Sequence, residues 1–448
     1  MSDDRIKILH LTPHLGTGVG TVLLNYLAKV KTDARFVHSV ACLDYANDLG
    51  QAAAKEHGFS LQDNFSQRPE ELLKIISTVD IVLVHQWNYP MFYDFFVRHP
   101  LPAGRVIMWS HTTGAPAPNN FTEKLLRYPD KFVFTTPLSF DVKEVKNLIN
   151  NLPDHFSAIW STGGAERLQW IKPQAHQGFN VGYIGSLDPA KLHPDFLEIC
   201  GQIDIPEAHF IVVGGPNDKS LELKNKAIDL GIADKFTFTG WVTEEEKWKY
   251  LALFDVFGYP LAQHHYGSSD QILQEAMGVG VAPVVFNNPM ESLMVKNNEC
   301  GLVAADAVEY IKAVEKLYHD QLLRQSLARN AKQYALANFS LDKMEKEWNE
   351  LFTKVLLLPK TPKIWPLSKT ITEITAKDVL LEALGEYGRP FADYCQAKNE
   401  LEKKQAMEQI KDLAKLVNWQ SASKGTAHQY VKFFPEDEYL MQWDLWTK

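Results

Sequence analysis

Two glycine-containing segments have the residue types needed to bind an anionic ligand. The first, residues 14–20 (HLGTGVG), lies between a strand-like run, Ile6–Thr12, and helical spacing from Val19 to Val30. Glycines let a backbone approach a ligand closely, and free N–H groups at a helix start attract anions. Gly18 and Gly20 are therefore candidate contacts, although tight packing alone also explains glycines at such a turn.

The same loop leaves a dinucleotide-binding interpretation open. That fingerprint needs an acidic residue about 20 residues later, at the end of a second strand. Asp44 follows the strand-like run Val37–Leu43, which is close to the required place.

The second segment, residues 267–278 (GSSDQILQEAMG), runs from small residues into a helix with an apolar stripe. Ser268 or Ser269 is expected to cap this helix, and its first amides could bind a phosphate. Glu275 falls in the second turn, where a partly buried carboxylate needs a partner. Sugar hydroxyls would provide one, and a capping or solvated glutamate is the alternative.

Further candidates lie at neighbouring strand ends. Lys191, in residues 185–191 (GSLDPAK), could reach a diphosphate as a point charge, and an exposed surface lysine is the alternative. Gly214 marks another tight strand end. His264 and His265 are adjacent, and adjacent histidines rarely bind one ion, so no metal is expected.

These residues need elements that bring strand ends together. Short apolar runs alternate with helical patterns, and continuous apolar strands are typical of parallel sheets covered on both faces. We therefore expect an α/β protein with two Rossmann-like, doubly wound domains, residues 1–170 and 178–358, facing a cleft. Ligands bind such sheets outside the carboxyl ends of the strands.

The chain beyond this pair of domains has a different character. Pro359, Pro362 and Pro366 mark a boundary, and residues 359–448 are predicted to be a helical, aromatic-rich extension. We expect this extension to pack against the body of the protein; holding a partner or lining an acceptor site are the alternatives.

Composition excludes several classes of protein. The 448 residues carry a formal net charge of -9, which argues against nonspecific nucleic-acid binding. Four widely spaced cysteines indicate reduced thiols and a cytoplasmic protein. No apolar run has the roughly 18–20 residues of a membrane span, although a local patch could still contact a membrane surface.

Taken together, these motifs resemble a known family. Residues 5–358 are similar to the GT-B retaining glycosyltransferases (glycosyl transferases group 1), which include bacterial mannosyl- and glucosyltransferases and sucrose synthase. The resemblance rests on the glycine-rich first turn, GSLDPAK, FTFTGWVTEEEKWKYLALFDVFGYP and YGSSDQILQEAMGVGVAPVV. The last two motifs, in this order and spacing, are specific to the family.

The resemblance assigns roles to several residues. His111 matches the histidine that contacts the donor sugar near the reacting carbon, with His85 as second choice. Asp270 fits a variant that has an acidic residue just before the helix, with a role either at the donor sugar or in fixing the loop. Trp241 and Val242 match the nucleobase site, although Trp241 could instead belong to the core.

The diphosphate and ribose contacts match only in part. Lys191 matches the family's diphosphate lysine, but Ser186 stands where the family has arginine. Glu275 matches the glutamate that holds the ribose, but Gly267 replaces the other glutamate of the motif.

The resemblance implies transfer of a hexosyl unit, with retention, from a UDP- or GDP-type sugar to a glycan or lipid-linked acceptor, in surface polysaccharide or glycolipid assembly. The leaving phosphate would take the acceptor proton, so no protein nucleophile, metal or other cofactor is expected. Gly18, Gly20 and Lys191 would stabilise the charge of the leaving group. The alternatives are an epimerase or phosphorylase of the same architecture, and a degenerate nucleotide- or partner-binding protein, which Ser186 and Gly267 would explain. The oligomeric state stays open.

Overall fold

The computed structural model describes residues 4–16, 18–263, 265–419 and 424–447, and it divides the chain into two compact units. Unit 1 comprises Met1–Ser161 and Glu345–Lys448, and unit 2 comprises Thr162–Met344. One boundary therefore falls inside helix α14 (Leu341–Val355), whereas the sequence suggested residue 358. Residues 359–448 belong to unit 1 rather than forming a domain of their own.

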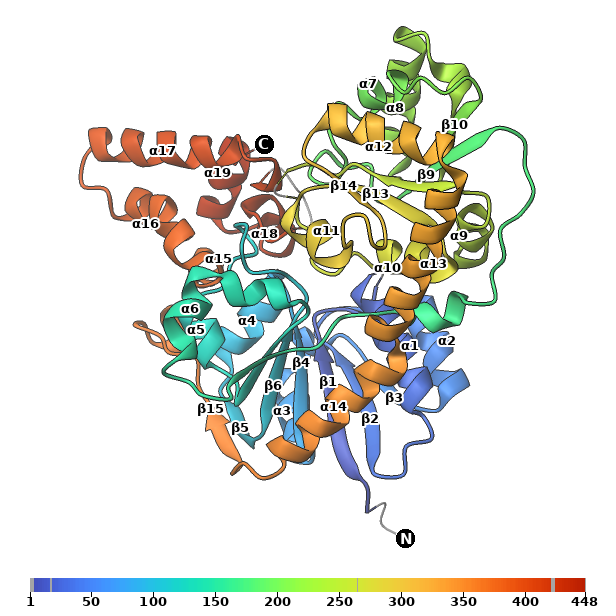
Figure 1. The fold of residues 1–448 in the computed structure, drawn as a ribbon. Coiled ribbons are helices and arrows are strands. Elements are labelled where there is room, and N and C mark those ends of the chain that lie inside the picture. Colours follow the sequence, from blue (N-terminus) through green and yellow to red (C-terminus); the bar gives the residue numbers. More distant parts are fainter. Residues whose placement is uncertain (1–3, 17, 264, 420–423, 448) are drawn as a thin grey trace. The chain divides into compact units, whose positions relative to one another are not determined.

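Unit 1 is built on a seven-stranded sheet in which every pair of neighbouring strands is parallel (Figure 1). The strand order is β3-β2-β1-β4-β6-β7-β8. The strands are β1 (Ile6–Thr12), β2 (Phe36–Cys42), β3 (Ser60–Gln62), β4 (Ile81–Gln86), β6 (Val106–Ser110), β7 (Lys131–Phe134) and β8 (Phe156–Ala158). The order reverses between β1 and β4, so the switch point of this sheet lies at their carboxyl ends.

Helices connect these strands. They are α1 (Val19–Val30), α2 (Asp48–His57), α3 (Pro69–Ser77), α4 (Pro90–Arg98), α5 (Glu123–Arg127) and α6 (Lys143–Ile149). Helix α1 has the predicted bounds, and its buried residues Val22, Leu23 and Tyr26 recur at helical spacing. Gly18 caps this helix with a φ of 60°, a conformation that favours glycine.

Unit 2 contains a six-stranded parallel sheet in the order β11-β10-β9-β12-β13-β14. Its strands are β9 (Phe179–Ile184), β10 (Ala208–Val213), β11 (Phe236–Gly240), β12 (Val256–Tyr259), β13 (Ala282–Phe286) and β14 (Leu302–Ala304). Its helices are α7 (Phe196–Gly201), α8 (Asn217–Asp229), α9 (Glu244–Leu251), α10 (Gln271–Val279), α11 (Pro289–Met294), α12 (Ala307–His319) and α13 (Gln321–Asn338). The order reverses between β9 and β12. Two doubly wound sheets confirm the predicted α/β class.

The C-terminal extension completes the core of unit 1. It consists of β15 (Thr361–Lys363), which pairs antiparallel with β5 (Leu101–Gly104), and of α15 (Ala376–Leu384), α16 (Arg389–Gln396), α17 (Glu400–Ala414), α18 (Ala427–Phe433) and α19 (Glu438–Thr447). Its buried Trp365, Tyr430 and Trp443 belong to the same apolar cluster as Phe92 and Phe96 of α4. The expectation that the extension packs against the body is therefore confirmed. None of the helices in the described ranges combines the length and hydrophobicity needed to cross a bilayer.

Candidate functional site

Lys191 and Asp270 form an ion pair at the switch point of unit 2. Lys191 lies in the loop after β9, and Asp270 ends the loop after β12, so two adjacent strands bring them together. The Lys191 Nζ lies 3.0 Å from Asp270 Oδ1, and the Tyr259 hydroxyl donates to the same oxygen at 3.2 Å. Two residues predicted independently therefore act as one polar group.

Burial makes this pair strongly coupled. The side chain of Lys191 is 14% exposed and that of Asp270 only 2%. Burial alone would raise the pKa of Asp270, but Lys191, His265 and a hydrogen bond with Glu291 together outweigh it and hold that pKa below its usual value. In turn, Asp270 keeps the pKa of Lys191 raised despite burial. Both groups are therefore ionised, and the charge of Lys191 is balanced within the chain.

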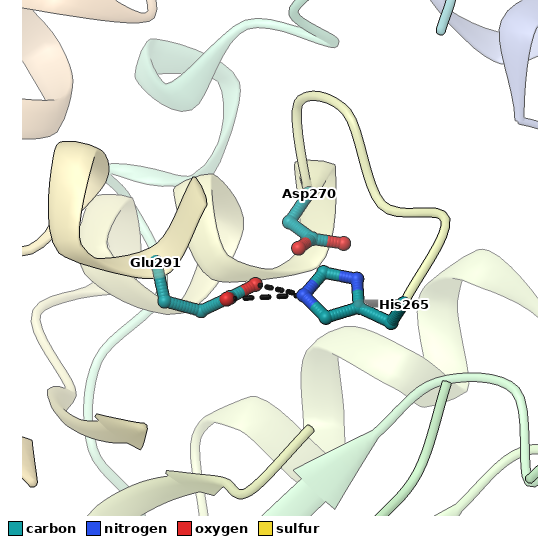
Figure 2. A group of neighbouring side chains, drawn as sticks. All are labelled: His265, Asp270 and Glu291. Carbon is teal, nitrogen blue, oxygen red and sulfur yellow. Dashed lines mark hydrogen bonds and ion pairs between the residues drawn. The ribbon is translucent and has the colours of Figure 1, made fainter. Parts of the chain in front are cut away.

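Asp270 also faces a second buried carboxylate (Figure 2). The Nε2 atom of His265 lies 3.0 Å from both oxygens of Glu291, while the backbone N–H of Gly267 donates to His265 Nδ1 at 2.9 Å. Because Nδ1 accepts a hydrogen bond, Nε2 carries the proton and donates to Glu291. Burial lowers the pKa of His265, but Glu291 outweighs that effect and the pKa is raised. Burial raises the pKa of Glu291.

This cluster has the donor set of a metal site. One ligand atom each from His265, Asp270 and Glu291 lies within 4.8 Å of the others, and imidazole with two carboxylates suits a divalent cation. Lys191 and the His265 ring already supply hydrogen-bond donors to the two carboxylates. The expectation that no metal takes part stays a prediction, and His264 lies outside the described residues.

The start of α10 differs from the expected one. Asp270 occupies the N-cap position, so the expectation that Ser268 or Ser269 caps the helix was wrong. The side chain of Asp270 turns to Lys191 and makes no capping hydrogen bond. Ser269 instead accepts hydrogen bonds from Gln274 Nε2, at 2.6 Å to its carbonyl oxygen and 3.0 Å to its hydroxyl.

Glu275 has the partner that its burial requires. Its carboxylate lies 2.7 Å from Lys247 Nζ on α9, and both side chains are 15% exposed. Burial raises the pKa of Glu275, and Lys247 opposes that shift. A lysine thus meets the need that sugar hydroxyls were expected to meet, and the ribose contact stays a prediction.

The other predicted residues of unit 2 line strand ends. The Ser186 hydroxyl accepts from Asp188 N at 3.2 Å. Gly214 has a φ of 134°, and a Cβ there would lie 2.0 Å from the Gly185 carbonyl oxygen, so this position requires glycine. Trp241 is 66% exposed, which contradicts its alternative assignment to the core, and Val242 is half-buried.

In unit 1, the predicted glycines play different parts. A Cβ on Gly18 would lie within 4 Å of none of the described residues. Gly20 is buried in α1, and a Cβ there would lie 3.5 Å from the backbone of Leu15. Packing therefore accounts for Gly20, and the ligand contact of Gly18 stays a prediction.

His111 follows β6 and is buried in a row of histidines. Its Nε2 atom lies 2.9 Å from His85 Nδ1, and the row continues through His10 to His38. Burial lowers the pKa of His111 to about 3, so the ring is neutral. His85 and His111 were predicted from the sequence, whereas His10 and His38 were not. The available signal was a histidine inside an otherwise apolar strand.

Comparison with known proteins adds a family and a fold. Residues 166–334, which lie within unit 2, match the family model described as Glycosyl transferases group 1. No curated protein resembles the chain closely enough in sequence to count as a relative.

Several solved structures share the architecture. The structure of Anabaena Alr3699/HepE in complex with UDP has a TM-score of 0.62 at 16% identity, over 78% of this chain and 100% of that chain. Sucrose-phosphate synthase from Thermosynechococcus elongatus gives 0.60 at 15% identity, over 78% and 99%. The lipopolysaccharide outer core galactosyltransferase WaaB gives 0.58 at 13% identity, over 78% and 100%.

Identities this low establish the fold alone, and the family match adds the enzyme class, which confirms the predicted glycosyltransferase. The chain therefore has the GT-B fold, and its residues 166–334 match the family of group 1 glycosyltransferases.

Proposed function

We propose that this protein transfers a hexosyl unit from a UDP-type sugar to a glycan or lipid-linked acceptor, with retention, in surface polysaccharide or glycolipid assembly. The observation that carries the proposal is the Lys191–Asp270 pair at the sheet switch point, inside the segment that matches the family. The Anabaena neighbour forms complexes with UDP and with UDP-glucose, which favours uridine as the base.

Four side chains of unit 2 would bind the donor. The exposed indole of Trp241 offers a surface on which a nucleobase can stack. Lys191 has further N–H groups for the diphosphate, Asp270 would accept from a sugar hydroxyl, and Glu275 from the ribose. Ser186 and Gly214, which were also predicted to bind the donor, would border its diphosphate.

The reaction needs few groups from the protein. The bond between the anomeric carbon and the β-phosphate oxygen breaks, a bond to the acceptor oxygen forms on the same face, and the acceptor proton passes to the leaving phosphate. Lys191 and the first amides of α10 stabilise the charge that develops on that phosphate. Neutral His111 forms a hydrogen bond with the transferred sugar, and the proposal includes no metal or other cofactor.

Replacing Trp241 tests the donor site without disturbing the core. Trp241→Ala should weaken UDP binding by about fivefold or more, because stacking on an aromatic ring contributes roughly 1–3 kcal/mol per base. Isothermal titration with UDP and UDP-glucose measures this loss. Trp170→Ala is the matched control, since Trp170 is a second exposed tryptophan of unit 2, at 64% exposure. Equal affinity in both variants would remove Trp241 from the site.

One set of contacts favours a second function, nucleotide binding without transfer. Lys191 is already paired with Asp270, and Glu275 with Lys247. Assays of UDP release and of the sugar product, with a panel of donors and acceptors, separate the two functions. Binding of UDP with no release from any donor would support the second function and overturn transfer.

A further inference from the structure

Four buried histidines form one hydrogen-bonded chain across the sheet of unit 1. His38 lies on β2, His10 on β1, His85 on β4, and His111 just after β6, and these four strands are neighbours in the sheet. The three links measure 2.9 Å, 3.1 Å and 2.9 Å. All four rings are at most 8% exposed. We call them the imidazole chain.

Each link joins the same pair of atoms. His38 Nδ1 meets His10 Nε2, His10 Nδ1 meets His85 Nε2, and His85 Nδ1 meets His111 Nε2. A neutral imidazole carries one N–H, and each link needs one N–H and one lone pair. The four rings must therefore share one tautomer, with every proton on Nδ1 or every proton on Nε2.

Burial keeps the four rings neutral. Desolvation lowers the pKa of all four histidines, and neighbouring imidazoles lower those of His10 and His85 further. The ionisable groups around the chain are Tyr26, whose ring lies against His10 and His38, and the more distant Asp33 and Glu345. Asp33 opposes the shift of His38 without cancelling it.

The two ends of the imidazole chain show why the other three rings affect His111. At one end, His38 Nε2 is buried and has no partner within the described part of the protein. At the other end, Nδ1 is the one nitrogen of His111 outside the chain. Moving the proton of His111 from one nitrogen to the other would require all four rings to change tautomer together. We propose that His38, His10 and His85 are positioning residues that hold His111 in a single neutral tautomer, and so decide whether its Nδ1 donates to or accepts from the transferred sugar. This role for His111 rests on the proposed function.

The wild-type protein tests the chain without any assay of activity. Long-range 1H–15N spectra of the whole protein, labelled with 15N-histidine, distinguish the Nδ1–H, Nε2–H and imidazolium forms of each ring. We expect the four rings to show one common tautomer at pH 7. Two different tautomers among them, or an imidazolium, would overturn the inference.

Interrupting the imidazole chain at His10, two rings away from His111, tests whether the tautomers of the rings are coupled. His10→Phe keeps a ring in the core but removes both links, and we expect His111 to populate both tautomers. Tyr26→Phe is the matched control, because it removes a buried hydroxyl that has no partner among the described residues and leaves the links intact. Its His111 signals should match those of the wild type. Unchanged His111 signals in His10→Phe would show that the tautomer of His111 does not depend on His10, and would overturn the coupling.

Measurements of kcat and KM connect the imidazole chain to the reaction. In His10→Phe, kcat should fall about tenfold while KM for the nucleotide sugar changes less than about threefold, because a wrong tautomer impairs the reaction more than binding. Tyr26→Phe should keep both constants. A wild-type kcat in His10→Phe would refute the positioning role. If no nucleotide sugar is turned over by the wild type, the proposed function fails, and the spectra still decide whether the tautomers are shared.

Discussion

At the scale of single residues, Glu275 illustrates how one lysine keeps a buried charge in place. Removing one partner of a buried pair leaves the other uncompensated. Lys247→Met should therefore lower the free energy of unfolding by about 3 kcal/mol, within the range for broken buried pairs. Urea unfolding at pH 7 measures the loss.

Two further variants make this prediction specific. Lys247→Met combined with Glu275→Gln should recover much of the stability, since no buried charge is then left unpaired. Glu244, the second partner of Lys247 at 3.0 Å, has a side chain that is 52% exposed. Lys219→Met breaks the exposed pair with Glu222, at 2.8 Å, and should change stability by less than about 1 kcal/mol. A double variant no more stable than Lys247→Met would show that the pair contributes through packing rather than charge.

The sequence predicted the members of the unit 2 site better than their contacts. Lys191, Asp270 and Glu275 were singled out because each stands beside a strand end or a helix start. Their pairing was not predictable, because 79 residues separate Lys191 from Asp270. The His265–Glu291 contact depends in the same way on where two loops meet.

At the scale of elements, the long apolar strands were predictable and the short edge strands were not. β1 and α1 have the predicted bounds, and β2 begins and ends within one residue of the predicted run Val37–Leu43. β3, β8 and β14 have three residues each, too few for a hydrophobic pattern to stand out. The start of α10 was misjudged because Asp270 serves the ion pair rather than a capping hydrogen bond.

The central strands β2, β1 and β4 make the first sheet sensitive to acid. Their histidines have lowered pKa values in the folded protein, whereas the unfolded chain takes up protons near the usual value of 6.5. The unfolded state therefore binds more protons below pH 6.5, and stability falls as the pH falls. For His38, the loss continues until its folded pKa of about 4.

A single replacement isolates the contribution of one ring. For each pH unit below 6.5, each buried histidine with a lowered pKa decreases the free energy of unfolding by about 1.4 kcal/mol. Compared with the wild type, His38→Phe should lose less stability between pH 7.5 and pH 5.5, by roughly 1 kcal/mol. Chemical unfolding at both pH values measures the difference. The quantity to compare is the loss of stability between the two pH values in each protein, not the stability at either pH. Parallel losses in the two proteins would mean that His38 is protonated as easily when folded as when unfolded.

At the scale of the whole molecule, the sequence predicted two α/β parts but not the division between them. Residues 305–358 have a helical pattern throughout, and nothing in that pattern marks the boundary that falls within α14. The prolines from residue 359 onward mark a real change of structure, but the chain beyond them returns to unit 1. Its aromatic residues fill a core that the strands and helices before residue 161 leave incomplete.

Hydrogen bonds support this shared core. The Tyr430 hydroxyl donates to Asn88 Oδ1 at 3.0 Å, and Asn120 Nδ2 donates to the Leu384 carbonyl oxygen at 3.0 Å. Helices α15 and α18 both contact α4. The extension and α4 should therefore lose stability together when either one is damaged.

Trp443 on α19 provides the test. Its side chain is fully buried and packs against Phe391, with ring centroids 4.9 Å apart. Trp443→Ala should cost about 3–5 kcal/mol and should raise amide exchange in α4 as well as in the extension. Leu445→Ala, at a residue of the same helix that is 70% exposed, should cost less than about 0.5 kcal/mol. Hydrogen exchange followed by mass spectrometry reads both regions at once. Faster exchange confined to α15–α19, with α4 as protected as before, would mean that the extension unfolds as a body separate from the rest of unit 1.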